Sequence, residues 1–237
     1  MDFDKENLPK HIAIIMDGNR RWARAKGKPA AFGHKEGAKT LEKIVRYANK
    51  IGIKHITVYA FSTENWKRDP AEVSLLMKLL EKFSDEILES DEKRKVKFKF
   101  YGDLSRLDPK LQKKVHEVEE KTKDNDVMTF GICLNYGGRD ELIHAIKSIA
   151  QDVKDGKASV EDIDVAMVDS KLYTAGVPDP DFIIRTSGEK RLSNFLTWQS
   201  TYAELYFPEI YWPEFDEIQM DKAIEEYIKR NRRFGGN

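Results

Sequence analysis

The sequence predicts an α/β protein with a mainly parallel central sheet of about six strands, flanked by helices. Short runs rich in β-branched and aromatic residues alternate with longer segments whose apolar residues recur every three or four positions. Such alternation implies right-handed βαβ crossovers and a sheet covered on both faces. The chain has 237 residues and shows no internal repeat or long linker, so we expect a single domain spanning residues 1–237.

Six short apolar runs are the predicted strands. They cover residues 11–16, 56–61, 96–101, 127–134, 182–184 and 203–207. The fourth run contains the only cysteine, Cys133, among apolar neighbours. We therefore expect a buried thiol and no disulfide within the chain.

The predicted helices follow from apolar spacing and end signals. The first carries Leu41, Ile44 and Ile51 on one face and stops at Gly52, a common C-terminal breaker. A longer helix begins at Asp69-Pro70-Ala71-Glu72, where Asp69 caps it, Pro70 suits the first turn and Glu72 completes a capping box. Further helices are expected at 109–123, 140–153 and 216–232, with an irregular segment at 155–180.

The composition excludes several classes of protein. Lys plus Arg and Asp plus Glu number 41 each, and a net charge near zero argues against bulk nucleic acid as the partner. The N-terminus is acidic and polar, unlike a signal peptide. Every apolar run is shorter than the ~20 residues of a membrane span. We expect a cytoplasmic protein without a transmembrane segment; contact with a membrane surface stays open.

The residues that follow four predicted strands share an unusual composition. Each segment combines Gly, Asn or Ser with Arg, at 17–22, 62–68, 135–139 and 185–193. In open parallel sheets, ligands bind outside the carboxyl ends of the strands. Glycine lets the backbone approach a ligand, and arginine offers forked donors to phosphate oxygens. Gly33-His34, where the first helix begins, adds backbone N–H groups. Together these features predict a diphosphate site.

Asp17 is an acidic residue within one of these arginine-containing segments. An Asp beside a Gly is most often a turn residue, but beside Arg20 and Arg21 at a strand end a magnesium ligand becomes a competing interpretation. The other well-known phosphate and metal signatures, including Walker A and Asp-Asp-x-x-Asp, are missing from the sequence. The residues alone therefore indicate an α/β enzyme or binder for a diphosphate compound, without naming the reaction.

Several sequence blocks, in order along nearly the whole chain, resemble undecaprenyl diphosphate synthase and the wider cis-prenyltransferase family. The blocks are residues 11–22, 33–37, 59–66, 135–139, 184–193, 202–206 and 232–236. The resemblance implies a parallel sheet wrapped by helices and a homodimer. It also implies an isoprenyl transferase that condenses isopentenyl diphosphate, in cis and repeatedly, onto an allylic diphosphate such as farnesyl diphosphate. The product would be a long-chain polyprenyl diphosphate such as undecaprenyl diphosphate, the lipid-carrier precursor for cell-wall synthesis.

The resemblance also implies roles for individual residues. Asp17 would bind Mg²⁺ and be essential for catalysis, Glu204 would help to place the metal, and Asn65 is the candidate proton acceptor. The allylic diphosphate would be held by Gly18, Asn19, Arg20, Arg21, Trp22, His34 and Arg68. Isopentenyl diphosphate would be bound by Arg185, Arg191, Leu192 and Ser193. The reacting centre would be lined by Ser62, Thr63, Glu64 and Trp66.

Three further expectations accompany the resemblance. The growing chain needs an apolar tunnel, whose wall would be Val73, Leu76, Met77 and Leu80, with Glu81 and Lys82 facing outward. The tail at 233–235 resembles a family end that reaches the partner subunit's active site. Ala30 departs from the pattern, because members often have an Arg there that contacts diphosphate. That phosphate contact is either missing or supplied by Lys28.

Some of these residues also have plainer interpretations. Before the resemblance is considered, Trp66, Trp198 and Trp212 are each better explained as packing residues. Glu204 lies in an aromatic segment, where a buried carboxylate needs a metal or an arginine as partner. Two alternatives for the whole chain remain. One is a non-catalytic subunit of a cis-prenyltransferase complex, against which Asp17 and the intact 18–21 segment speak. The other is an unrelated diphosphate or nucleotide enzyme on an α/β sheet.

Overall fold

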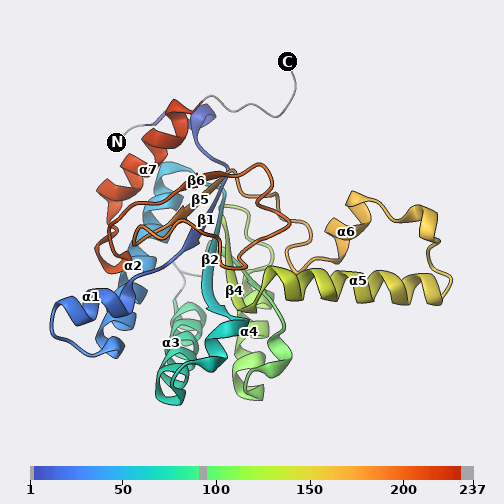
Figure 1. The fold of residues 1–237 in the computed structure, drawn as a ribbon, viewed down its shortest axis with the longest axis horizontal. Coiled ribbons are helices and arrows are strands. Elements are labelled where there is room, and N and C mark those ends of the chain that lie inside the picture. The colour runs from blue at the N-terminus through green and yellow to red at the C-terminus, as the bar shows by residue number, and fades with distance from the viewer. Residues whose placement is uncertain (1–2, 91–94, 231–237) are drawn as a thin grey trace.

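The protein is built on one sheet of six parallel strands in the order β3-β4-β2-β1-β5-β6 (Figure 1). The computed structural model describes residues 3–90 and 95–230, so the predicted tail contact at 233–235 lies outside the described residues. The strands are β1 His11–Ile15, β2 His55–Ser62, β3 Lys97–Tyr101, β4 Thr129–Tyr136, β5 Phe182–Arg185 and β6 Glu204–Tyr206. The predicted α/β class and the six parallel strands are confirmed.

Seven α-helices occur within the described ranges. They are α1 Asn19–Ala25, α2 Ala30–Ile51, α3 Pro70–Glu89, α4 Pro109–Thr122, α5 Gly138–Lys154, α6 Val165–Lys171 and α7 Glu217–Lys229. Helix α3 begins as predicted: the Asp69 side chain accepts hydrogen bonds from two N–H groups of the first turn, and Pro70 is its first residue. Helix α2 ends at Gly52, whose φ of 103° is left-handed. Each described helix falls short of what crossing a bilayer requires.

Two of these helices differ from the prediction. Helix α1 occupies a segment for which no helix was predicted, and α6 lies in the segment 155–180, which was expected to be irregular. Helix α1 buries only Trp22 and Ala23, and the described residues of α6 are all at least partly exposed. A seven-residue helix without an apolar stripe gives no periodic signal, which explains both differences.

The two faces of the sheet carry separate cores. Successive residues of a strand point to opposite faces. Thus Ile12 and Ile14 belong to the larger core, which also contains side chains of α2, α4 and α7. Ala13 and Ile15 pack in a smaller core with Cys133, which is buried and free as predicted. Because β1 is covered on both faces, the segment that follows it starts from a fixed position.

Candidate active site

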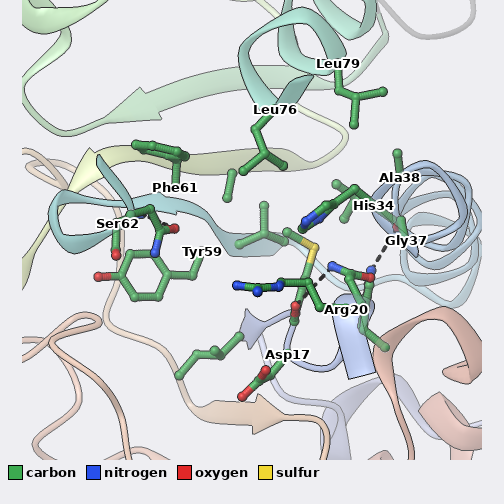
Figure 2. A pocket seen from close by; sticks show the side chains of 18 of the residues that line it. Asp17, Arg20, His34, Gly37, Ala38, Tyr59, Phe61, Ser62, Leu76 and Leu79 are labelled. Carbon is green, nitrogen blue, oxygen red and sulfur yellow. Dashed lines mark hydrogen bonds between the residues drawn. The ribbon is translucent and has the colours of Figure 1, made fainter. Parts of the chain in front are cut away.

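The segments after β1, β2 and β5 line one cavity of about 1170 Å³ at the carboxyl edge of the sheet (Figure 2). Helices α1, α2 and α3 complete the wall. The ionisable residues of the lining are Asp17, Arg20, Arg21, Arg24, Lys28, His34, Glu64, Arg68 and Arg185. Much of the remaining lining is apolar, and in Figure 2 Leu76 and Leu79 of α3 lie on the side opposite Asp17. The cavity therefore joins a charged mouth to an apolar interior.

Asp17 is held at the mouth by contacts to both its side chain and its backbone. Its carboxylate accepts from Arg185 Nη2 at 3.0 Å and lies 2.9 Å from Arg21 Nη2. Burial raises the pKa of Asp17, but the hydrogen bonds and charges of Arg185 and Arg21 outweigh burial and leave the pKa below its usual value. The Asp17 carbonyl accepts from Thr186 Oγ1 at 2.7 Å and from Ser187 Oγ at 2.9 Å. Asp17 is thus an ionised carboxylate on a fixed backbone.

Glycines allow α1 and α2 to approach each other beside Asp17. Gly18 has a φ of 104°, and a Cβ there would lie 2.1 Å from Ser187 Oγ. A Cβ at Gly33 would lie 2.0 Å from the Asn19 carbonyl oxygen, so α2 touches the backbone of α1. Larger residues would push the two helices apart. Trp22 lies outside the cavity lining, where it stacks on Phe32 at 5.6 Å between ring centroids.

Glu72 joins three basic residues of the predicted allylic diphosphate site. Its Oε1 accepts from His34 Nε2 at 3.1 Å and from Arg68 Nη1 at 3.0 Å, and its Oε2 lies 3.6 Å from Arg20 Nη1. A carboxylate only accepts, so His34 carries its proton on Nε2. Burial lowers the pKa of His34, and Glu72 offsets this only in part, so the ring is neutral near pH 7. Glu72 therefore gathers side chains from α1, α2 and the start of α3.

The turn after β2, a 3₁₀ segment at Thr63–Lys67, carries Asn65 and Trp66. Asn65 lines the cavity, and its Oδ1 accepts from Ser62 N at 3.1 Å. Trp66 lies outside the lining; its Nε1 donates to Asn135 Oδ1 at 2.7 Å, and Arg106 lies 4.5 Å from its ring centroid. The packing interpretation of Trp66 fits this arrangement.

The loop after β5 is organised around Arg185. Its Nη1 donates to Ser193 Oγ at 2.7 Å and also to the Arg191 carbonyl. Its buried Nε has no hydrogen-bond partner among the described residues, so a donor remains for a ligand. Arg191 itself is 61% exposed and pairs with Glu189, which also accepts from Arg21 at 3.0 Å.

The apolar interior is built mainly from α3 and the strands. Leu76, Met77 and Leu80 line it, as predicted for the tunnel wall, whereas Val73 packs against the larger core. Glu81 pairs with Lys110 and Lys114 of the α4 side, and Lys82 is 73% exposed, so both charged residues lie outside the lining. A second cavity of about 310 Å³ shares Leu41 and Phe83 with the first.

A family model described as "Putative undecaprenyl diphosphate synthase" matches residues 15–235 of the sequence. The chain belongs to this family of prenyltransferases. It is 49% identical over 232 residues to an isoprenyl transferase of Clostridium perfringens, with 98% of this chain and 92% of the relative covered. A ditrans,polycis-undecaprenyl-diphosphate synthase of Pasteurella multocida, named as specific for (2E,6E)-farnesyl diphosphate, is 46% identical over 236 residues. The match covers 100% of this chain and 98% of that relative.

A solved structure supports the same family. Lavandulyl diphosphate synthase from Lavandula x intermedia, crystallised with dimethylallyl diphosphate, superimposes with a TM-score of 0.93. Its sequence is 36% identical to this one, and the match covers 98% of this chain and 100% of that chain. The predicted family resemblance is therefore confirmed along nearly the whole chain.

Most site residues expected of this prenyltransferase family meet in the cavity. The predicted residues that line it are Asp17, Gly18, Asn19, Arg20, Arg21, His34, Ser62, Glu64, Asn65, Arg68, Arg185 and Ser193. The predicted residues outside its lining are Trp22, Thr63, Trp66, Arg191, Leu192 and Glu204. Thr63 donates to Asp140 at 3.2 Å, beside the first turn of α5.

Glu204, expected to help place the metal, lies away from Asp17 within one chain. It begins β6 and pairs with Phe182, the first residue of β5, whereas Asp17 follows the carboxyl end of β1. In a parallel sheet these are opposite edges, so Glu204 and Asp17 do not meet within one chain. Glu204 instead pairs with Arg230 at 2.8 Å, the arginine alternative foreseen for its carboxylate. The described residues contain no group of three His, Cys, Asp or Glu side chains placed to hold a metal.

Two residues make contacts at the site that the sequence did not reveal: Glu72, beside the cavity, and Asn194, in its lining. Glu72 was assigned only to a capping box, although its spacing of four from Arg68 is typical of an ion pair within one helical turn. Asn194 directly follows the predicted loop and lines the cavity. Its contacts, described below, are to residues far away in the sequence, so no local pattern indicates them.

Proposed function

We propose that this prenyltransferase condenses isopentenyl diphosphate with an allylic diphosphate to make a long-chain polyprenyl diphosphate such as undecaprenyl diphosphate. The observation that carries the proposal is the cavity, whose charged mouth suits diphosphates and whose apolar interior suits an isoprenoid tail. Farnesyl diphosphate is the proposed primer, since the Pasteurella multocida relative is named as specific for it.

Two clusters of polar and basic residues support two diphosphate subsites. Arg20, His34 and Arg68 surround Glu72 on one side and would bind the allylic diphosphate. Arg185 and Ser193 lie on the other side of Asp17 and would bind isopentenyl diphosphate. During the reaction, negative charge grows on the departing allylic diphosphate. Guanidinium groups already in place stabilise that charge without reorganisation.

Asp17 is the proposed Mg²⁺ ligand. Magnesium is commonly held by one or two carboxylates together with substrate phosphates, and Asp17 is an ionised carboxylate between the two subsites. When bound, Mg²⁺ would neutralise charge on the diphosphate leaving group. Asp17 now engages Arg21 and Arg185, so ligation would release these guanidiniums toward the phosphates. Glu204 is not part of this proposal.

Asn65 is proposed to orient the reacting groups. Its Oδ1 already accepts a hydrogen bond from Ser62 N at 3.1 Å, and an amide is a weak base. The proton lost after carbon–carbon bond formation would therefore pass to the released diphosphate rather than to Asn65. Ser62 and Asn65 both line the cavity in which this would occur.

A homodimer is proposed through the outer face of α5. In Figure 1 this helix extends past the sheet, beside α6. Its Ile143 and Ile146 are 52% and 59% exposed, and Val165 of α6 is 65% exposed. Several large apolar side chains exposed together are typical of an interaction surface.

One assay tests the function. The chain alone is incubated with radiolabelled isopentenyl diphosphate and farnesyl diphosphate, with Mg²⁺ or with EDTA. We expect label in solvent-extractable polyprenyl diphosphate with Mg²⁺ and none with EDTA. A non-catalytic subunit or an unrelated diphosphate enzyme would give no labelled product under either condition, and that result would refute the proposal.

A further inference from the structure

The loop between β5 and β6 has an unusual backbone. Among the described non-glycine residues, five have a positive φ, and four of them lie in this loop: Ser187 at 75°, Ser193 at 52°, Asn194 at 66° and Leu196 at 45°. L-residues rarely adopt this conformation, and they keep it only where surrounding contacts fix it. Asn tolerates it better than most residues. The loop must therefore be anchored at specific points.

Asn194 makes three hydrogen bonds to two other elements. Its carbonyl accepts from Gly138 N at 2.7 Å, and its Oδ1 accepts from Arg139 N at 2.8 Å. Its Nδ2 donates to Glu64 Oε1 at 3.1 Å. Asn194 thus connects its own loop to the first turn of α5 and to the turn that follows β2.

The contact with α5 replaces a missing cap. The N-cap residue of α5 is Gly137, which has no side chain to accept from the first N–H groups of the helix. Asn194 supplies both acceptors from a position 55 residues later in the chain than Arg139. A Cβ at Gly137 would lie 2.7 Å from Asn194 Nδ2, so the glycine makes room for this contact.

The residues joined by Asn194 flank the predicted isopentenyl diphosphate subsite. Ser193, its neighbour, accepts from Arg185 at 2.7 Å. Glu64 and Asn194 themselves line the cavity, as does Ser193. A shift of Asn194 would therefore change the separation between Ser193 and the turn that carries Asn65, while leaving the cluster around Glu72 in place.

We propose that Asn194 is a positioning residue that locks the loop after β5 against α5 and against Glu64, and so sets the isopentenyl diphosphate subsite. The proposal rests on the proposed function, since that assigns the subsite. Nothing in it requires Asn194 to touch a reacting atom.

The first test is Asn194→Asp. Aspartate keeps an oxygen acceptor for the Arg139 N–H but replaces the donor to Glu64 with a second oxygen, so two carboxylates face each other. We expect the KM for isopentenyl diphosphate to rise about 10-fold, with a far smaller change in the KM for farnesyl diphosphate. Asn194→Gly, which accepts the backbone conformation but removes both side-chain contacts, should raise the same KM.

The second test restores the lost donor. Combining Asn194→Asp with Glu64→Gln places an amide opposite the new carboxylate, and the KM for isopentenyl diphosphate should return toward that of Glu64→Gln alone. Asn7→Asp is the matched control, because Asn7 Nδ2 donates to Asp4 at 3.2 Å on an exposed surface. It makes the same chemical change against an acid and should leave both KM values unaltered.

Equal rises in the two KM values, or no rescue in the double variant, would overturn the positioning role. These outcomes differ from failure of the proposed function, in which the unmodified chain itself would incorporate no isopentenyl diphosphate. Thermal unfolding of each variant separates the KM effect from a general loss of the fold, which would affect both substrates.

Discussion

Asp17 combines a rigid backbone with a replaceable set of side-chain partners. Its carbonyl is fixed by two hydroxyl groups and by Trp212 N at 3.0 Å. Within residues 3–90 and 95–230, its carboxylate pairs with Arg21 and Arg185, groups that are proposed to bind phosphate. Substrate binding can therefore rearrange the side chain without moving the chain around it.

We predict that Asp17→Ala lowers turnover about 10²-fold or more, the usual scale for losing one preorganised electrostatic element. The fold should survive, since the hydrogen bonds to the residue 17 carbonyl do not need the carboxylate. Steady-state turnover with saturating Mg²⁺ and circular dichroism provide the two measurements. Turnover near that of the unmodified chain would contradict the role of Asp17.

At the residue scale, the sequence predicted which strand ends carry the site but not how side chains pair there. Asp17, Arg20, His34 and Arg185 follow from strand-end position and family resemblance, and all line the cavity. Pairing depends on tertiary distances. Glu204 illustrates the limit, because its sequence neighbourhood does not show that its carboxylate pairs with Arg230.

At the scale of elements, the side chain of His11 links β1 by hydrogen bonds to β2 and to the segment before β5. Its Nδ1 donates to the Pro178 carbonyl at 2.6 Å, so its Nε2 accepts from Thr57 Oγ1 at 2.8 Å. The bond that Nε2 accepts requires a neutral ring, because both nitrogens of a protonated imidazole are donors. The ionisable groups nearest this ring are His55, 5.7 Å away between ring centroids, and Asp181, whose carboxylate accepts from the His11 backbone N–H.

We predict that His11 makes stability depend on pH. Burial lowers its pKa from 6.5 to about 4, so the unfolded chain binds a proton more readily than the folded chain between these values. The stabilisation is complete above pH 6.5 and is lost as pH falls toward 4. Between about pH 6.5 and pH 5 the loss should be on the order of 1–2 kcal/mol.

Urea unfolding at these two pH values measures that loss. His11→Gln should be less stable than the unmodified chain at neutral pH. Its unfolding free energy should decrease less on acidification than that of the unmodified chain. The unfolding free energy of the variant should still fall somewhat with pH, because burial also lowers the pKa values of His55 and His34. If His11→Gln loses as much unfolding free energy between the two pH values as the unmodified chain, His11 is not the group that causes the pH dependence.

Elements with a buried apolar stripe were predicted well. Helix α3 carries both a cap and such a stripe, and its predicted start at Pro70 is confirmed. Helices α1 and α6 lack the stripe. Such helices depend on packing against neighbouring elements, as α1 does where the backbone of Asn19 contacts Gly33 of α2. The pattern of a single sequence does not contain that information.

At the scale of the whole molecule, the proposed dimer can be tested on α5. We predict that Ile143→Lys combined with Ile146→Lys shifts the protein from dimer to monomer in light scattering, since charges would replace the apolar contact. Ile218→Lys on α7, at a residue 62% exposed, is the matched control and should leave the mass unchanged. A dimeric mass for the double variant would place the interface elsewhere.

The order of the strands is the part of the fold that the sequence leaves open. Alternating strands and helices predict parallel pairing, but they do not say that β1 lies between β2 and β5. That choice depends on which apolar faces pack together across long separations. The cavity depends on it too, because only this order brings the segments after β2 and β5 to either side of Asp17.

The contacts of Trp212 have a consequence for synthesis of the chain. Its backbone N–H donates to the Asp17 carbonyl, and its Nε1 donates to the Gly37 carbonyl at 2.8 Å. The ribosome releases the N-terminal segments first. Asp17 and α2 therefore leave the exit tunnel long before the residue that fixes them. A nascent chain that stops short of Trp212 would already contain Ser193 and Arg185, yet the proposed diphosphate site would still lack the two hydrogen bonds from Trp212 to Asp17 and Gly37.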